Sequence, residues 1–439
     1  MNGILFLIFF YKKELLLLLH RNRGLPRLCF RVFFFVMVRN LQGPTEKQPR
    51  RTREEEATGE NAGLTELPTE IISNILSRLP VKTLLRIRSV SKGWRSIIDH
   101  RSFADLVLAQ SLGSSDVTSL ISIVGNIEPT RFGRRFFSLD HQTGFAVPLG
   151  QLDQTINSTG QDWQSVNGLI CFDIGDLTYV CNISTREVRA LPPAGPDFPV
   201  HLHRGMHSFS ALGFDPVTRR YKVMKTWVSN ALNHAGEVIT AHKILTLGTH
   251  SWRKIDSGPI DFPCGGSVCI NGSIHFLTLD LMSNKIIVAF DVETEKFRTL
   301  TLPDGALNQV QKMKLIAFGG CLTVLDYEHL EDENSMSLYV LEDYKNRVWM
   351  ERPIVLPRSW KEDLSRSERF LIGSVRAGEI LLAPKVTAGE VYFLSYDVEK
   401  GILKKVQVHG LPPSLLRSPV IIACAPIGYV HSILALSEV

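Results

Sequence analysis

Apolar side chains recur at helical spacing between residues 64 and 111, and the helices that they predict are short. Pro68 stands near the first helical position, where its missing N–H costs nothing, and Pro80 cannot continue the helix. Between them lies an apolar stripe formed by Ile71, Ile72, Ile75, Leu76 and Leu79. A second apolar cluster precedes a third helix, which Ser91 is expected to cap; together they contain Leu84, Leu85, Ile87, Val90, Trp94, Ile97 and Ile98.

So short a segment cannot bury so many large apolar side chains against one another. The surplus predicts either a docking surface for another helical protein or a helical cap on the domain that follows. Residues 67–98, LPTEIISNILSRLPVKTLLRIRSVSKGWRSII, resemble an F-box, the module that attaches a substrate receptor to the Skp-type adaptor of a cullin–RING ubiquitin ligase. The resemblance implies adaptor-facing or motif-core positions at Leu67, Pro68, Ile71, Ile75, Leu79, Pro80, Leu84, Val90 and Trp94.

From Leu120 onward the pattern changes to short β-rich runs of period two, separated by Gly, Pro, Asn and Asp. The runs form hairpins in pairs, such as VCINGSIHFLT followed by IVAFDVETEKFRTLTLP. The pairs recur at a spacing of roughly 45–55 residues, which is typical of a four-stranded propeller blade. Five full blades are predicted to start near residues 163, 209, 265, 313 and 369.

Two pieces remain outside these five blades. The hairpin at 120–149 lacks inner strands, and residues 419–436 form a pair of apolar strands without outer partners. Joining the two closes a ring of six blades and leaves no open sheet edge. A β-sandwich is the alternative, but so long a run of double hairpins does not suit one.

Two stretches, GFDPVTRRYKVMK (213–225) and LGTHSWRKI (247–255), resemble the kelch-like F-box-associated domain of plant F-box proteins. The predicted fold class is therefore α+β and multidomain. A short helical F-box at 64–111 is followed by an all-β, six-bladed kelch-like propeller at 120–436.

Residues 1–63 form a leader whose nature stays open. Its apolar runs are interrupted by charge, none approaches the ~20 residues needed to span a bilayer, and no clean signal-peptide cleavage site follows. The leader is either unstructured, or upstream sequence translated from a mistaken gene model with Met37 as the true start, or a weak membrane-associated segment. Residues 39–63 are polar and charged, which predicts disorder.

The net charge of +5 resides entirely in residues 1–63, where 11 Lys and Arg outnumber 6 Asp and Glu. A nucleic-acid binder carries its basic excess on the folded domain, so we expect no nucleic-acid partner, and we do not favour a membrane partner. The seven cysteines are scattered and form no CxxC pair, which predicts neither a disulfide framework nor a zinc site. A reducing compartment, cytoplasm and/or nucleus, fits this usage.

The sequence offers no trusted catalytic set. It contains no GxSxG, Walker-type or HExxH motif, and we expect no catalytic residue, cofactor or metal. Asp215, Asp291 and Asp397 are predicted to cap tight turns, and Trp252 and Trp349 to pack within blades. The acidic stretch 328–335 lacks the spacing of a calcium loop and is predicted to be a solvated loop.

Recognition surface is expected on the loops that join blades and on the loops between each blade's middle strands. The loops 192–209 and 357–369 carry residue types that often dominate protein–protein binding energy. The candidate target-binding residues are Phe198, His201, His203, Arg204, His207 and Trp360. The alternative is that both loops simply pack across the propeller.

The predicted function is that of a substrate-recognition subunit of an SCF ubiquitin ligase. The F-box would bind a Skp-type adaptor, and through it the cullin and RING subunits, while the propeller holds a target protein for ubiquitination and degradation. The chain would contribute proximity and not catalysis. The alternatives are a propeller-fold enzyme or carbohydrate-binding protein, which would need converging polar groups or a metal, and a membrane-tethered scaffold that uses residues 1–38.

Overall fold

The computed structural model describes residues 69–436 apart from short gaps at 91, 114–117, 129–130, 142, 150–153, 156–162, 200–205, 233–237, 257, 259–265, 280–284, 307–311, 365–369, 376–377, 388, 417–419 and 423–426. The predictions for residues 1–68 lie outside the described residues. The chain divides into two compact units, residues 1–103 and 104–439, which are described separately. No helix in the described part of the chain is both long and apolar enough to cross a membrane.

The predicted short helices are confirmed. They are α3 (Thr69–Ser77), α4 (Val81–Ile87), α5 (Lys92–Ile98) and α6 (Arg101–Gly113), and α6 runs on into the second unit. Pro80 lies between α3 and α4 and is the N-cap residue of α4. Its carbonyl accepts the first bonds of that helix, from the N–H groups of Thr83 (2.8 Å) and Leu84 (3.1 Å). Arg88 and Arg95 both pair with Asp99, which ties the end of α4 to α5.

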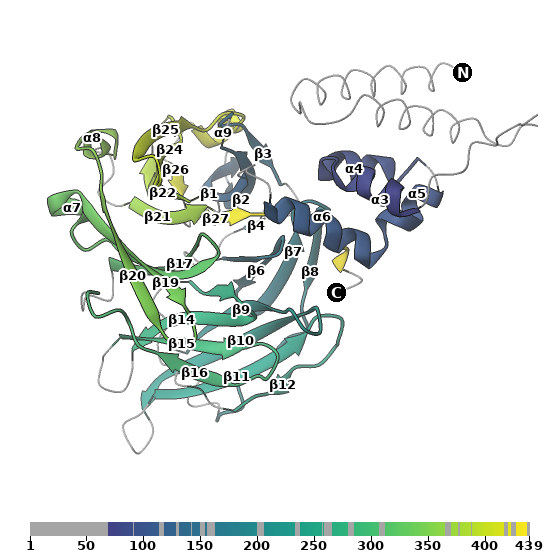
Figure 1. Cartoon of the computed structure of the whole chain (residues 1–439), viewed down its shortest axis with the longest axis horizontal. Helices are drawn as coiled ribbons and strands as arrows, with labels where there is room; N and C mark the ends of the chain where they lie inside the picture. The colour runs from purple at the N-terminus through teal and green to yellow at the C-terminus, as the bar shows by residue number, and fades with distance from the viewer. Residues whose placement is uncertain are drawn as a thin grey trace, which may run out of the picture. The chain divides into compact units, whose positions relative to one another are not determined.

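Five four-stranded antiparallel sheets follow, here called blades 1 to 5 (Figure 1). Each begins within three residues of its predicted start. Blade 1 contains β5 (Gln164–Val166), β6 (Leu169–Ile174), β7 (Leu177–Asn182) and β8 (Glu187–Ala190), and blade 2 contains β9 (His207–Asp215), β10 (Arg220–Leu232), β11 (Val238–Thr246) and β12 (Arg253–Lys254). Blade 3 contains β13 (Val268–Ile270), β14 (Ser273–Leu279), β15 (Lys285–Asp291) and β16 (Phe297–Leu300), and blade 4 contains β17 (Met313–Phe318), β18 (Cys321–Asp326), β19 (Ser335–Asp343) and β20 (Val348–Val355). Blade 5 contains β21 (Phe370–Val375), β22 (Glu379–Pro384), β24 (Tyr392–Asp397) and β25 (Ile402–Gln407).

Blade 6 joins the two ends of the propeller, which confirms the predicted closure. Its strands are β1 (Thr118–Glu128), β2 (Arg131–Asp140), β3 (Ala146–Pro148), β4 (Gln154–Thr155), β26 (Val420–Ile422) and β27 (Ile427–Tyr429), and the short β23 (Val386–Thr387) also pairs with β26. The internal arrangement differs from the prediction. Both β26 and β27 pair with the same edge of β1, so the C-terminal segment supplies one interrupted strand position and not two inner strands.

The C-terminal segment continues past blade 6 and packs on blade 1. The side-chain amide of Asn182 donates to the carbonyls of Ser432 (3.0 Å) and Leu434 (2.9 Å), and the N–H of Leu436 donates to Glu187 Oε2 (2.8 Å). Residues 430–436, here called the C-terminal strap, therefore connect the last blade of the ring to the first.

The hydrophobic core lies between neighbouring blades. The first strands of successive blades contact one another in the cyclic order β5, β9, β13, β17, β21 and β27. Strands near the centre are buried on both faces, as in β6, whereas outer strands such as β8 alternate between partly buried and exposed side chains. This difference explains why the inner hairpins are more uniformly apolar in sequence.

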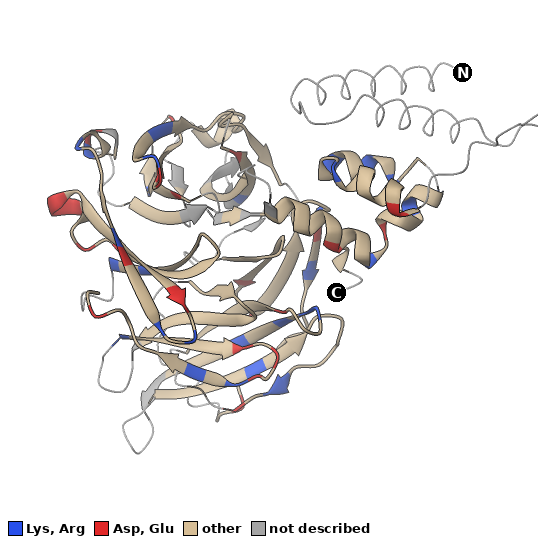
Figure 2. Cartoon of the chain, in the orientation of Figure 1, with Lys and Arg blue, Asp and Glu red and all other residues tan. Residues whose placement is uncertain are grey.

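Ion pairs also connect blades. Lys222 on β10 lies 2.7 Å from a carboxylate oxygen of Glu295 in the β15–β16 turn, and Arg253 pairs with the same carboxylate. Basic and acidic residues both occur along the propeller (Figure 2). Lys225 and Asp173 form a buried pair between blades 2 and 1, with 3.6 Å between nitrogen and oxygen.

The predicted turn aspartates are confirmed as caps. Asp215 accepts bonds from the N–H groups of two residues that follow it, at 2.9 and 3.2 Å, and Asp397 does the same in its own turn. Asp291 accepts one such bond, from the N–H of Thr294 (2.8 Å). Trp252 Nε1 donates to the carbonyl of Pro192 (2.7 Å), which agrees with its predicted role in blade packing. The remaining short helices are α7 (Leu330–Glu333), α8 (Ser359–Leu364) and α9 (Pro413–Leu416). Thus α7 occupies the acidic stretch predicted as a loop, and it forms around the buried Leu330.

Candidate functional site

One face of α3 presents apolar side chains to solvent. Ile71 is 48% exposed, and Ile75, one turn later on the same face, is half-buried. Beyond the helix end, Leu79 is half-buried and Pro80 is exposed. These four residues, here called the α3 stripe, are large apolar groups in contact with water, which is typical of an interaction surface.

Three of the other positions assigned to the motif lie within the described residues. Leu84 is fully buried on α4 and Trp94 on α5 retains 7% exposure, so both side chains belong to the core of the helices. Val90 is half-buried in the turn between them. Leu67 and Pro68 lie outside the described residues.

Of the predicted target-binding residues, the structure describes Phe198, His207 and Trp360. Phe198 is half-buried after β8, His207 is exposed at the start of β9, and His201, His203 and Arg204 lie outside the described residues. Trp360 on α8 requires a correction. Its ring is only 3% exposed, its Nε1 donates to Asn334 Oδ1 (3.0 Å) and its edge contacts Phe370, so it packs in the core between blades 4 and 5.

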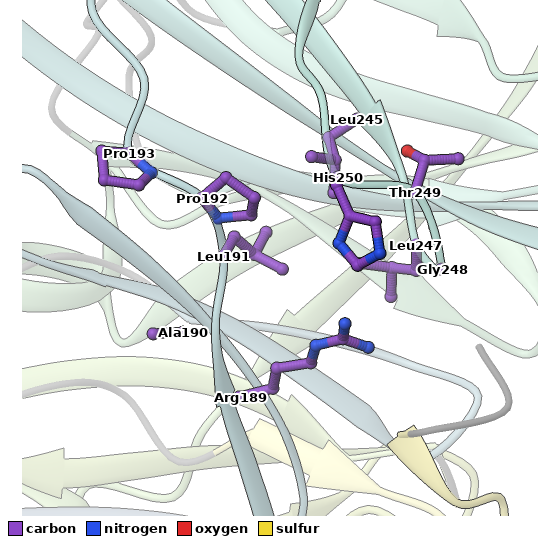
Figure 3. Close-up of a pocket in the computed structure, with 10 residues that line it drawn as sticks. All are labelled: Arg189, Ala190, Leu191, Pro192, Pro193, Leu245, Leu247, Gly248, Thr249 and His250. Atoms are coloured by element: carbon purple, nitrogen blue, oxygen red, sulfur yellow. The ribbon is translucent and has the colours of Figure 1, made fainter.

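A pocket of about 340 Å³ lies between the outer strand of blade 1 and the β11–β12 turn of blade 2 (Figure 3). Arg189 and His250 extend into this space from opposite sides, over walls that include Leu191, Pro192 and Leu247. The sequence analysis missed this pocket. Arg189 stands in an ordinary alternating outer strand, and no sequence signal links it to a turn some sixty residues later.

Several titratable side chains are buried between blades. His242 and His275 are almost fully buried, and burial lowers the pKa of each to about 4; for His275 the charge of Arg298 also contributes. Burial raises the pKa of the Cys181 thiol to about 12, and burial followed by the charge of Asp173 raises that of Cys171. These two thiols are therefore unreactive packing groups. Among the described residues no cluster of three or more His, Cys, Asp or Glu could hold a metal.

Comparison with known proteins covers both units. Residues 64–105 match the F-box domain, and residues 133–429, more than half of the chain, match the F-box associated beta propeller domain. The chain belongs to the F-box proteins. It is 27% identical to an F-box protein of Arabidopsis thaliana over 88% of this chain and 96% of that one, and 31% identical to a putative F-box protein of the same plant over 79% and 88%.

A further relative agrees with this assignment. An F-box/kelch-repeat protein of Arabidopsis thaliana is 24% identical over 86% of this chain and 93% of that protein. Among solved structures, TolB from Acinetobacter baumannii aligns with a TM-score of 0.43 and 8% identity over 75% of this chain and 72% of that one. In this F-box protein the match to the propeller domain omits β1 and the C-terminal strap, although both take part in closing the ring.

Proposed function

We propose that this F-box protein is the substrate-recognition subunit of an SCF ubiquitin ligase. Its F-box, residues 64–111, docks on a Skp-type adaptor and through it reaches the cullin and RING subunits. Its propeller, residues 120–436, binds a target protein that is ubiquitinated and degraded. The compartment proposed for this activity is the cytoplasm and/or the nucleus.

The observation that carries the proposal is the α3 stripe within a matched F-box. Ile71, Ile75, Leu79 and Pro80 stay accessible, whereas other apolar groups of the motif such as Leu84 and Trp94 are buried. Burying such a face in an adaptor would contribute free energy in proportion to the apolar area removed from water, about 25 cal/mol per Å². The adaptor contacts are therefore assigned to the stripe, and Leu84 and Trp94 are assigned a supporting role in the helical core.

In this proposal the chain holds no catalytic group of its own. Binding a target beside a loaded ubiquitin-conjugating enzyme raises the effective concentration of the target lysine. The propeller suits this role because loops on a rigid scaffold can vary without loss of the fold.

The test is co-purification of a Skp-type adaptor with the full chain. Ile71→Glu and Ile75→Glu place charge on the accessible stripe and are expected to abolish co-purification without unfolding the helices. Val217→Glu is the matched control, because Val217 is an exposed apolar residue in a propeller turn, 67% accessible. Adaptor capture that survives both stripe variants, or an unmodified chain that captures no adaptor, would contradict the proposal.

A further inference from the structure

The pocket between blades 1 and 2 has walls that are fixed before any ligand binds. On one side, the carbonyl of Pro192 accepts a bond from Trp252 Nε1 (2.7 Å), which holds the chain after β8 in place. On the other, the N–H of Leu247 donates to the carbonyl of Tyr221 (2.9 Å), and Gly248 adopts a φ of 89° that glycine tolerates best. A preformed pocket loses little conformational entropy when it is filled.

The chemistry of the pocket is cationic and apolar. Arg189 is the one lining residue with a permanent charge, and neither Asp nor Glu lines the pocket in the described part of the chain. The remaining walls are formed largely by leucine and proline side chains, with Thr249 and His250 at the exposed rim. A buried floor of this kind favours an apolar side chain of the ligand next to one anionic group.

The guanidinium of Arg189 is held in place and still has donors to offer. One of its nitrogens donates to the carbonyl of Leu436 in the C-terminal strap (3.1 Å). A guanidinium has five N–H donors, so two parallel donors, here called the Arg189 fork, remain to bind the two oxygens of a carboxylate. The acidic residue on the same face of β8, Glu187, is already engaged by the N–H of Leu436 and by Thr185.

We propose that this pocket binds an extended peptide segment of the target in which an apolar residue adjoins a carboxylate. The carboxylate pairs with the Arg189 fork, and the apolar side chain lies between Leu191 and Leu247. One cation fits a monoanionic carboxylate better than a doubly charged phosphate. The volume lies at the small end of the range of about 300–1,000 Å³ that is usual for ligand sites, so only a short segment is read. The proposal rests on the receptor function proposed above.

Three small peptides test it against the purified full chain with its adaptor, by ligand-observed NMR titration. They are N-acetyl-Leu-Glu-N-methylamide, its neutral Gln counterpart, and N-acetyl-Leu-Ala with a free terminal carboxylate. A carboxylate peptide is expected to bind at least roughly tenfold more tightly than the Gln peptide, since a charge-assisted bidentate pair is lost in the latter. Whichever carboxylate peptide binds more tightly identifies a side chain or a chain terminus as the source.

Variants assign the effect to Arg189. Arg189→Gln should reduce binding of the carboxylate peptide to the level of the Gln peptide, and Arg189→Lys should recover it only in part, because lysine lacks the planar fork. Thr249→Glu adds a competing carboxylate at the rim without touching the Leu436 contact, and it should also weaken binding. Arg352→Gln on β20, an exposed arginine on the outer strand of another blade, is the matched control.

Two results would overturn the inference. One is that neither carboxylate peptide binds more tightly than the Gln peptide. The other is that no peptide binds at about 10 mM, a concentration above the millimolar dissociation constants expected of a minimal ligand. Adaptor co-purification is measured on the same samples. A chain that keeps its adaptor but ignores the carboxylate refutes only this pocket, whereas loss of the adaptor from the unmodified chain refutes only the receptor function.

Discussion

Mild acid should destabilise the propeller through His242 and His275. Each imidazole is neutral in the folded state, because burial lowers its pKa from 6.5 to about 4. In the unfolded chain each of these histidines is protonated below pH 6.5, whereas in the folded chain it stays neutral down to about pH 4. Protonation therefore favours the unfolded state, so the free energy of unfolding is unaffected above pH 6.5 and decreases as the pH falls towards 4. At pH 5 the loss is about 2 kcal/mol for each histidine.

Carboxylates contribute little in this window. Burial tends to raise the pKa of Glu295, but hydrogen bonds from Arg253 and Lys222 outweigh it and hold the pKa below its usual range. In the folded state this group therefore stays largely ionised between pH 7 and pH 5. The amount by which a histidine variant reduces the pH 7 to pH 5 difference in unfolding free energy therefore reports that histidine.

The assay is urea unfolding of the full chain at pH 7 and pH 5, followed by tryptophan fluorescence. His242→Asn and His275→Asn are each expected to lower the free energy of unfolding at pH 7. Each should also reduce the difference in unfolding free energy between pH 7 and pH 5 by about 2 kcal/mol. The double variant should reduce this difference by about 4 kcal/mol, because the two sites lie in different blades and their effects add. Val217→Asn, at an exposed position without an ionisable group, controls for the introduced amide. An unchanged pH dependence in the double variant would refute the argument.

Three further outcomes are expected. A chain ending at residue 418 lacks β26, β27 and the C-terminal strap, so its propeller should become protease-sensitive or aggregate while adaptor binding survives; a truncated chain that stays monomeric and melts like the full chain would contradict this. Trp360→Ala should lower the free energy of unfolding in urea by roughly 3–5 kcal/mol, because it leaves a cavity in the core. An unchanged free energy of unfolding would contradict the buried position of Trp360. Lys225→Met leaves Asp173 buried without its cation and should cost about 3 kcal/mol, much of it recovered when Asp173→Asn is added; calorimetric melting of the single and double variants measures both.

The fold was predictable from sequence where side-chain periodicity reports burial. The central strands are apolar on both faces and the outer strands alternate, so paired hairpins could be counted and the six-bladed ring inferred. The helical motif was equally visible. Periodicity could not distinguish exposed from buried apolar residues within the helical motif. Ile71 and Leu84 are both apolar residues at helical spacing, but only Ile71 faces solvent.

The details that failed depend on contacts between distant residues. Trp360 stands in a polar stretch that predicts exposure, but its partner Asn334 comes from the end of α7. The segments β26 and β27 have three residues each, too few for a pattern to reveal that they share one edge of β1. The pocket at Arg189 arises only when the β11–β12 turn of the next blade packs beside β8.

Polar contacts explain how nearly interchangeable blades form one defined ring. The connecting segments set the order of consecutive blades, but apolar packing is non-directional and does not by itself fix how neighbouring blades are aligned. Every interface in the described chain carries a different polar contact. In ring order these are Lys225 with Asp173, Lys222 with Glu295, His275 with Tyr344, Lys314 with the carbonyl of Ile372, Glu379 with His141, and Asn182 with the C-terminal strap.

A ring with its blades aligned differently would bury these groups without their partners, at a cost of about 1–3 kcal/mol for each unsatisfied group. At the interface between blades 6 and 1, the polar partners on one side belong to the C-terminal strap and not to a strand of a sheet, and most of them are backbone groups. Strands β1 to β4 of blade 6 come from the start of the propeller sequence, whereas β26, β27 and the strap come from its end. The contacts that close the ring therefore depend on β26, β27 and the strap, the last blade-forming part of the chain.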